Sequence, residues 1–309
     1  MIYQIDNKKT QVSIEDMDEH HMYIGVMDLE ELKQTYHLFC ISPQFVERCE
    51  VSSLFEQNEM IPHKNYYFGI INLINSKSIF MKKDTFAFFI FKNCFLIVVL
   101  DDEDHHIEEL LLTSDDVLGE DVSLTHVVYY FLSELISRDY NYMEDLQNEI
   151  EELENHDSKE ESIHFTRQLK QKSKELLLLI NYYNNLVTVG EELQMNHHQI
   201  FVEDDMRYFE IFTRRIERLS KNAQMLKELL YQASEAHQAK LDYHMNKTMQ
   251  LFTVLTSIFM PLTLITGWYG MNFYYMPELK NPYGYLGVII LSISVITVSI
   301  FWFKKKKFF

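Results

Sequence analysis

Residues Leu251–Tyr269 read LFTVLTSIFMPLTLITGWY, and residues Tyr285–Phe303 read YLGVIILSISVITVSIFWF. Neither stretch carries a charge, and each is long enough to cross a hydrocarbon core of roughly 30 Å as a helix. The second is typical only of a membrane span. The first holds Thr, Ser and Gly, so it is either a polar-lined span or a buried helix, and its tandem placement favours the span. The sequence predicts a membrane domain over residues 251–309, with transmembrane helices at 251–269 and 285–303.

The charge of the chain is unevenly distributed. The net charge is −18, but residues 241–309 carry six Lys and two acids, which leaves −22 on residues 1–240. An acidic front argues against a nucleic-acid partner, which needs clustered Lys and Arg, and it suits cations. Lysines 304–307 follow the second span directly, so the positive-inside rule places the C-terminus in the cytoplasm. Two spans return the chain to the same side. We therefore predict a multi-pass protein of the cell membrane with both termini cytoplasmic.

Residues 1–122 mix short apolar runs with helical segments such as Pro43–Asn58, which predicts an α/β or α+β cytoplasmic domain. The longest apolar run, Phe86–Leu100, is broken by Lys92 and Asn93 and is too short to span a membrane. It favours two buried strands around a tight turn. The three cysteines are widely spaced, and we expect each to be a small buried hydrophobe. The other predicted apolar runs are Tyr66–Ile74 and Ile79–Met81.

Residues from Ser123 onward change to a helical period. Apolar residues recur every three or four positions as far as Leu153, which predicts one amphipathic helix. An acidic stretch, Glu149–Glu161, precedes a second helical run, Ile163–Val189, so residues 123–202 form an antiparallel hairpin. A third helix begins near Asp204. Because nothing breaks it before Pro261, we predict a stalk over residues 203–250 that is continuous with the first span.

One face of the first span is polar. Steps of three and four residues along it pass through side chains that are polar, Gly or Met, whereas the other faces are aliphatic or aromatic. Polar atoms avoid lipid, so this face meets protein or water. It is either a seam of small residues between helices or a pore lined by one helix from each subunit, which requires a symmetric homo-oligomer. The stripe is Asn246, Met249, Thr253, Thr256, Met260, Thr263, Gly267 and Gly270.

The string YGMNFYYMPEL at Tyr269–Leu279 follows IFMPLT at Ile258–Thr263 and precedes a basic tail. Together with two C-terminal spans and a long stalk, these motifs closely resemble the CorA family of magnesium channels. The match is close over Asn246–Phe309 and mainly architectural over 1–245. The resemblance implies a homopentamer with a cytoplasmic funnel, whose stalk helices line the pore.

The same resemblance implies roles for single residues. Asn272 would be the filter ligand at the outer mouth, with Gly270 and Met271 shaping its turn. Mg²⁺ sheds water reluctantly, so a ring of amide oxygens can hold it through its waters. Glu278 in the outer loop would raise the local cation concentration. Mg²⁺ is then substrate and a candidate regulator, with no permanently bound cofactor. The implied pore lining is Asn246, Met249, Phe252, Thr253, Thr256, Met260, Thr263 and Gly267, with Met249 and Phe252 as an apolar gate.

Regulation departs from the family pattern. Where family members carry an acidic residue on the stalk, shortly after a Tyr-Phe pair, this chain has Ile211 beside Glu210, and the expected partner acid near residues 75–77 is missing. We hypothesise weaker or relocated feedback by Mg²⁺. The alternative for each acidic cluster is a solvated surface without a regulatory role. Candidate regulatory acids are Glu210, Asp101 and Asp102, with further acids at 103–104, 108–109, 115–116 and 120–121.

The leading functional hypothesis is a Mg²⁺ influx channel that also admits Co²⁺ or Ni²⁺. A second is a Zn²⁺-moving relative of the same superfamily, against which the intact Met271 argues. A third is a membrane-anchored cytoplasmic sensor without transport. An enzyme is least favoured, since no nucleophile–base set stands out and no phosphate-binding G-x-x-x-x-G-K-[ST] is present. Three His-His pairs point their side chains to different faces, so they are poor zinc chelators.

Overall fold

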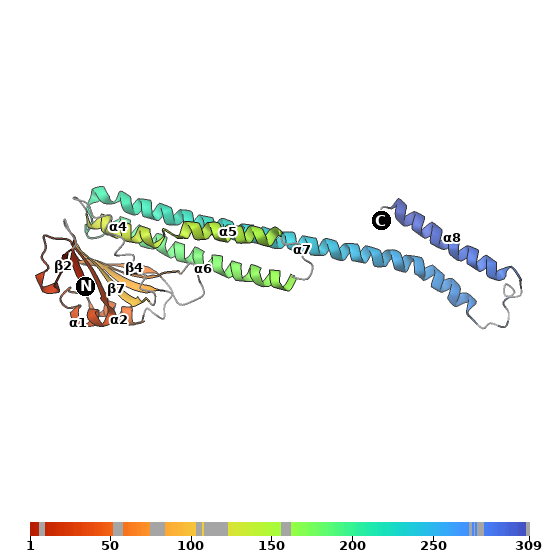
Figure 1. Cartoon of the computed structure of the whole chain (residues 1–309), viewed down its shortest axis with the longest axis horizontal. Coiled ribbons are helices and arrows are strands. Elements are labelled where there is room, and N and C mark those ends of the chain that lie inside the picture. Colours follow the sequence, from red (N-terminus) through yellow and green to blue (C-terminus); the bar gives the residue numbers. More distant parts are fainter. Residues whose placement is uncertain are drawn as a thin grey trace. The chain divides into compact units, whose positions relative to one another are not determined.

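The computed structural model describes residues 1–5, 10–51, 58–74, 84–102, 107, 123–155, 162–271, 274, 276 and 281–306. The chain, drawn in Figure 1, divides into two compact units, Met1–Ala233 and Ser234–Phe309.

A mixed seven-stranded sheet forms the base of the first unit, in the order β2-β1-β3-β7-β6-β5-β4. Strands β3 and β7 pair in parallel, and the other neighbouring pairs are antiparallel. The mixed sheet with its helices confirms the predicted α+β class. The strands are β1 (Ile2–Gln4), β2 (Thr10–Val12), β3 (Tyr23–Asp28), β4 (Glu59–His63), β5 (Tyr66–Asn72), β6 (Thr85–Ile90) and β7 (Cys94–Asp101).

The predicted turn at Lys92 and Asn93 is present between β6 and β7. Ile90 faces Phe95 in an antiparallel register, and the Phe91 amide donates to the Cys94 carbonyl at 2.8 Å. Both strands are buried nearly throughout, which is why the sequence there is continuously apolar rather than alternating. The predicted run Ile79–Met81 lies outside the described residues.

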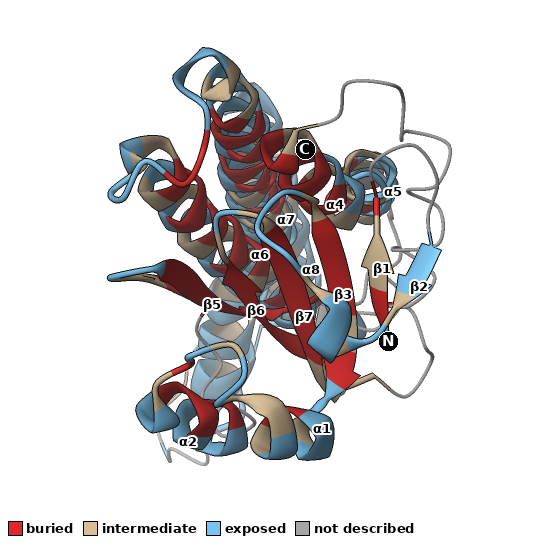
Figure 2. Ribbon diagram, turned by 90° about the vertical axis from the view of Figure 1, so that its left-hand side faces the viewer, coloured by how far each residue is buried: buried red, intermediate tan, exposed pale blue. Residues whose placement is uncertain are grey.

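Helices cover both faces of this sheet, as Figure 2 shows. Alternate residues of β6 point to opposite sides. Phe86 and Phe88 join the core beneath the long helices, while Ala87 and Phe89 join the core beneath α1 and α2. The helices of the first unit are α1 (Leu29–Thr35), α2 (Pro43–Val51), α4 (Leu124–Leu135), α5 (Asp139–Asn155) and α6 (Ser162–Met195), with short 3-10 turns η1 (Ile14–Asp16) and η4 (Glu203–Asp205).

Two of the three cysteines behave as predicted. Cys49 and Cys94 are buried, and desolvation raises the pKa of each thiol to about 12, so neither forms a reactive thiolate at neutral pH. Cys40 is exposed instead. It lies in the turns after α1 with φ of 55°, and this turn faces outward rather than into the core.

The predicted helix from Ser123 to Leu153 is wrong in one respect, because the structure divides it into α4 and α5. Ser123 caps α4 through a capping box, and α4 ends at Ile136, whose φ of −105° and ψ of 5° are not helical. The Ser137 hydroxyl donates to Glu134 Oε1 at 3.1 Å. The Ser137 amide also donates to the Glu134 carbonyl at 3.1 Å, three residues back rather than four, so the backbone leaves the α-helical pattern. The turn leaves Ile136 buried in the core.

Helix α7 (Arg207–Tyr269) confirms the continuous stalk and first span. Its 63 residues correspond to about 95 Å. It starts just after the acidic turn η4, where carboxylates favour a helix N-terminus. Within the first unit it buries one stripe at three- and four-residue steps, namely Phe209, Phe212, Ile216, Leu219, Ala223, Leu226 and Leu230.

The second unit contains the rest of α7 and helix α8 (Gly284–Lys305). Both helices are long and apolar enough to cross a membrane, and they contain the predicted spans. Val254 and Phe303 are the buried apolar side chains in the described part of this unit. Side chains such as Val298 and Phe301 are 65% and 70% exposed. Such surface is untenable in water, so lipid or protein must cover it.

Candidate functional site

The predicted polar stripe is fully accessible on α7. Met249 is 61% exposed, Phe252 59% and Met260 74%, and the described Asn, Thr and Gly members of the stripe are also exposed. Val254, which lies on another face, is 4% exposed. The stripe is therefore not a packing seam between α7 and α8 of one chain, and it remains open to water or to further copies.

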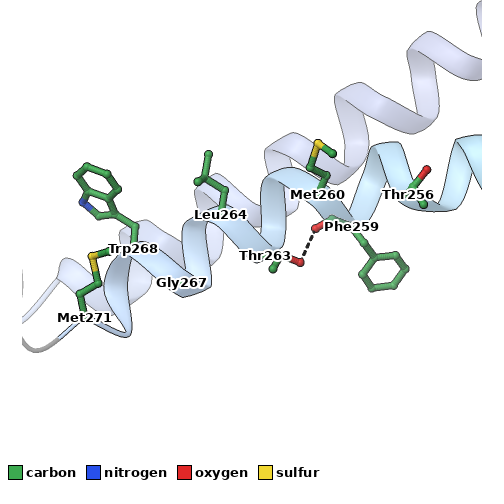
Figure 3. A pocket seen from close by; sticks show the side chains of 8 residues that line it. All are labelled: Thr256, Phe259, Met260, Thr263, Leu264, Gly267, Trp268 and Met271. Carbon is green, nitrogen blue, oxygen red and sulfur yellow. Dashed lines mark hydrogen bonds between the residues drawn. The ribbon is translucent and has the colours of Figure 1, made fainter.

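A shallow hollow of about 680 Å³ follows the outer half of this stripe (Figure 3). It contains four residues of the predicted pore lining, together with Met271. Figure 3 shows Met260, Leu264, Trp268 and Met271 on one side of the helix, with Phe259 directed away from them. The three- and four-residue steps of the predicted stripe pass over Phe259 and Leu264, which the sequence therefore assigns to other faces. The i, i+4 spacing of Met260, Leu264 and Trp268 was the signal that could have joined them.

The threonines of the stripe are oriented by their own helix. The hydroxyl of Thr253 donates to the Met249 carbonyl at 2.8 Å, that of Thr256 to the Phe252 carbonyl at 2.8 Å, and that of Thr263 to the Phe259 carbonyl at 2.9 Å. The last bond is the dashed line in Figure 3. Because each proton is already used, the oxygen is left as an acceptor. A face of acceptors suits a hydrated cation, whose waters direct their hydrogens outward.

The predicted filter starts where α7 ends. The Gly270 amide donates to the Thr266 carbonyl at 2.9 Å, and the Met271 amide to the Trp268 carbonyl at 3.4 Å. These two residues thus close the last turn of the helix. A Cβ on Gly270 would approach the Thr266 carbonyl oxygen to 3.0 Å, so this turn has little room for a side chain. Asn272 and Glu278 lie outside the described residues, and their roles stay predictions.

The family follows from a comparison of the whole sequence. The profile of the family described as CorA-like Mg²⁺ transporter protein matches residues 25–305. The chain belongs to this CorA-like family.

Two relatives in this family illustrate where the similarity lies. The chain is 22% identical over 291 residues to the cobalt/magnesium transport protein CorA of Thermotoga maritima, covering 92% of this chain and 81% of that protein. It is 48% identical over 69 residues to the magnesium transport protein CorA of Helicobacter pylori, covering 22% of this chain and 21% of that protein.

Solved structures of the family share the fold. The complete CorA magnesium transporter from Methanocaldococcus jannaschii superposes with a TM-score of 0.76 at 19% identity, covering 100% of this chain and 99% of that chain. The cytoplasmic domain of ZntB from Vibrio parahaemolyticus superposes with a TM-score of 0.61 at 11% identity, covering 79% and 100%. The predicted CorA architecture is thereby confirmed at the level of fold.

The predicted regulatory acids do not gather in the described part of this CorA-like chain. Glu210 is bound to Arg214 at 2.5 Å on the same helix, and the Asp102 carboxylate accepts from the Ile107 amide at 3.1 Å. Asp101 ends β7 opposite Thr85. Across the described ranges, no three His, Cys, Asp or Glu side chains are close enough to hold a metal ion. The other acids proposed from the sequence lie outside those ranges.

A buried polar network joins α5 and α6, and sequence reasoning missed it. The Tyr142 hydroxyl donates to Glu175, and Lys172 pairs with Glu175 at 3.0 Å and also with Glu149. Nearby, burial raises the pKa of Asp139 to about 6, and the Tyr183 side chain opposes this shift only in part. Desolvation raises the pKa of Tyr142, and the acceptor Glu175 adds to the shift. Lys172 pairs with Glu149 of α5 and with Glu175 of its own helix α6, so these ion pairs link the two helices.

Proposed function

We propose that this CorA-family chain is a passive channel that carries Mg²⁺ into the cell through a pore lined by the polar stripe of α7. The observation that carries the proposal is the stripe itself, which is polar, exposed and oriented as hydrogen-bond acceptors in an otherwise apolar helix. One α7 cannot enclose a pathway, so several copies must surround it. The family resemblance favours five, with lipid covering the remaining faces of α7 and α8.

The chemistry of the pore suits a cation that keeps its water. A ring of Asn272 amides at the outer mouth accepts hydrogen bonds from the first water shell, and the threonine oxygens at 253, 256 and 263 repeat this along the path. Neutral oxygens bind weakly enough to release the ion, which conduction requires. The relatives named for cobalt and magnesium transport support Mg²⁺ and Co²⁺ as substrates, and Ni²⁺ is a third candidate.

The membrane potential supplies the driving force, and an apolar constriction supplies the gate. A divalent ion gains roughly 4.6 kcal/mol on crossing a 100 mV membrane potential, so the chain needs no nucleotide hydrolysis and is no enzyme. Met249 and Phe252 form an apolar constriction that closes by dewetting. The protein lies in the cell membrane with both termini in the cytoplasm, where Mg²⁺ is also the candidate regulator.

Uptake by reconstituted protein tests the proposal. Full-length chain in proteoliposomes with a negative internal potential is exposed to Mg²⁺, Co²⁺, Ni²⁺ or Zn²⁺ in turn. We expect Mg²⁺ uptake by the wild type, its loss in Asn272→Ala, and no change in Asn281→Ala, a matched substitution in the same outer loop. Absence of uptake by the wild type contradicts the channel.

The same assay separates the two alternatives. Zinc stays the second candidate substrate, as the sequence resemblance to the wider superfamily allows. Zn²⁺ uptake without Mg²⁺ uptake would support that relative. A membrane-anchored sensor without transport predicts identical traces for wild type and Asn272→Ala.

A further inference from the structure

A second hollow, of about 950 Å³, lies in the first unit and is unrelated to the pore stripe. One side comes from α4 and the start of α5, and the other from the first turns of α7. Ile211, which occupies the place of the family's regulatory acid, is part of the lining. The family resemblance would place an acidic residue here, whereas this chain has an apolar residue beside arginines.

Arginine dominates the charge of this hollow. Four of the chain's seven arginines lie between residues 207 and 218, a cluster that the acidic total of the front part conceals. Arg214, Arg215 and Arg218 line the hollow, where Glu134 is the acidic residue of the lining. Glu210 pairs with Arg214, so positive charges exceed negative ones even with Glu210 included. Such a site repels a divalent cation.

Two of these arginines have no carboxylate partner among the described residues. No ion pair involves Arg215 or Arg218 among the residues that the structure describes, and both are exposed. Elsewhere on α7, Arg214 and Lys221 each pair with a glutamate one turn away. A guanidinium presents a planar fork of donors that fits phosphate oxygens bidentately. The unpaired pair is thus a ready phosphate-binding feature.

Aromatic rings complete the lining. Four tyrosines contribute, and Tyr129 contacts both Tyr130 and Tyr208, with ring centroids 5.5 and 5.3 Å apart. The Ser133 hydroxyl is buried at the lining without a hydrogen-bond partner in the described part of the chain. Tyrosine rings stack on planar groups.

We propose that this hollow binds a phosphate-bearing anion with a planar ring, of the size of a nucleotide. Its volume lies within the range of about 300–1,000 Å³ that is usual for small-molecule sites. Arg215 and Arg218 hold the phosphates, and the tyrosine rings hold the planar group. The inference does not rest on transport.

Calorimetric titration of the full-length protein in detergent, with EDTA present, tests this site. ATP, tripolyphosphate and adenosine are titrated separately, so the phosphate and ring contributions are resolved. ATP should bind most tightly, tripolyphosphate more weakly and adenosine weakest. In the double variant Arg215→Gln/Arg218→Gln, ATP affinity should fall at least about tenfold, since charge-assisted hydrogen bonds are lost. Tyr208→Leu should weaken ATP more than tripolyphosphate.

The matched control is Arg167→Gln/Lys170→Gln, which removes two positive charges from exposed positions of α6; it should bind ATP as the wild type does. The proposal is overturned if wild type binds no ATP, or if the control loses as much affinity. It is equally overturned if the double variant changes the sedimentation of the oligomer while wild type binds no anion, which would make the hollow a contact between copies. Mg²⁺ uptake by the same preparations reports on the proposed function independently.

Discussion

Helix α7 passes through two environments, and the contrast separates what one chain completes from what it leaves open. Between Phe209 and Leu230 the helix buries a continuous apolar stripe against α4, α5 and α6. From Leu241 to Thr253 every side chain is exposed. The first segment finishes its core within the chain. The second presents a polar face that no described residue covers. Such a face suits assembly of several copies around water, whereas the buried stripe suits packing within one chain.

The largest expected effect is a loss of stability on truncating a buried side chain of α7. Phe212 is fully buried, so Phe212→Ala should lower the free energy of unfolding by about 3–5 kcal/mol. Phe252→Ala, the same change on the same helix at a side chain 59% exposed, should cost less than about 1 kcal/mol and raise resting Mg²⁺ uptake by widening the gate. Thermal unfolding by circular dichroism compares the two. Equal destabilisation would mean that Phe252 is packed rather than at a pore.

The buried carboxyl of Asp139 should make the stability of the first unit depend on pH. Burial raises the pKa of Asp139 from 3.8 to about 6, so folding favours the protonated carboxyl. The penalty is absent below pH 4 and fully present above pH 6. Asp139→Asn should therefore stabilise the protein at pH 7, by up to roughly 3 kcal/mol. The gain in Tm should shrink as the pH falls from 7 to 4. A gain independent of pH would contradict this assignment.

Removing one acceptor tests the open segment. Thr256→Val keeps the shape but removes an oxygen from the stripe, and uptake of Mg²⁺ should fall about tenfold, the value of one net hydrogen bond to an ion's water. Thr266→Val, on the same helix but off the stripe, is the control and should transport normally. Tm should be unchanged in both. Equal uptake in the two variants would remove the threonines from the pathway.

The smallest effect concerns the ion pair at the start of α7. Glu210 and Arg214 are both largely exposed, so Glu210→Ala should change stability by less than about 0.5 kcal/mol. Closure of the channel by internal Mg²⁺, if present, should persist in this variant. Loss of closure in this variant would instead show that Glu210 takes part in regulation by Mg²⁺.

The sequence was most informative where the pattern is local. Spans, stalk and the β6–β7 turn follow from apolar runs and from the scarcity of Gly and Pro. The break at Ile136 was not predictable, because its cause is a turn that keeps one side chain in a core assembled from distant segments. The burial predicted for Cys40 was wrong for a similar reason, because the conformation of a turn decides which of its side chains enter the core. In the site, helical spacing identified the threonines, but it assigned Leu264 to another face. An apolar side chain beside a pore has the same sequence pattern as one beside lipid.

If the polar stripe of α7 lines a pore, water must reach it, and thiol labelling measures this. On a Cys40→Ser background the remaining cysteines are buried with pKa values of about 12, so an introduced thiol is the reactive one. Thr256→Cys and Leu255→Cys lie at the same depth on different faces of α7. A water-soluble cationic thiol reagent should modify Thr256→Cys and block Mg²⁺ uptake, while Leu255→Cys stays unmodified. Modification of Leu255→Cys alone would show that water follows another face and would contradict the account.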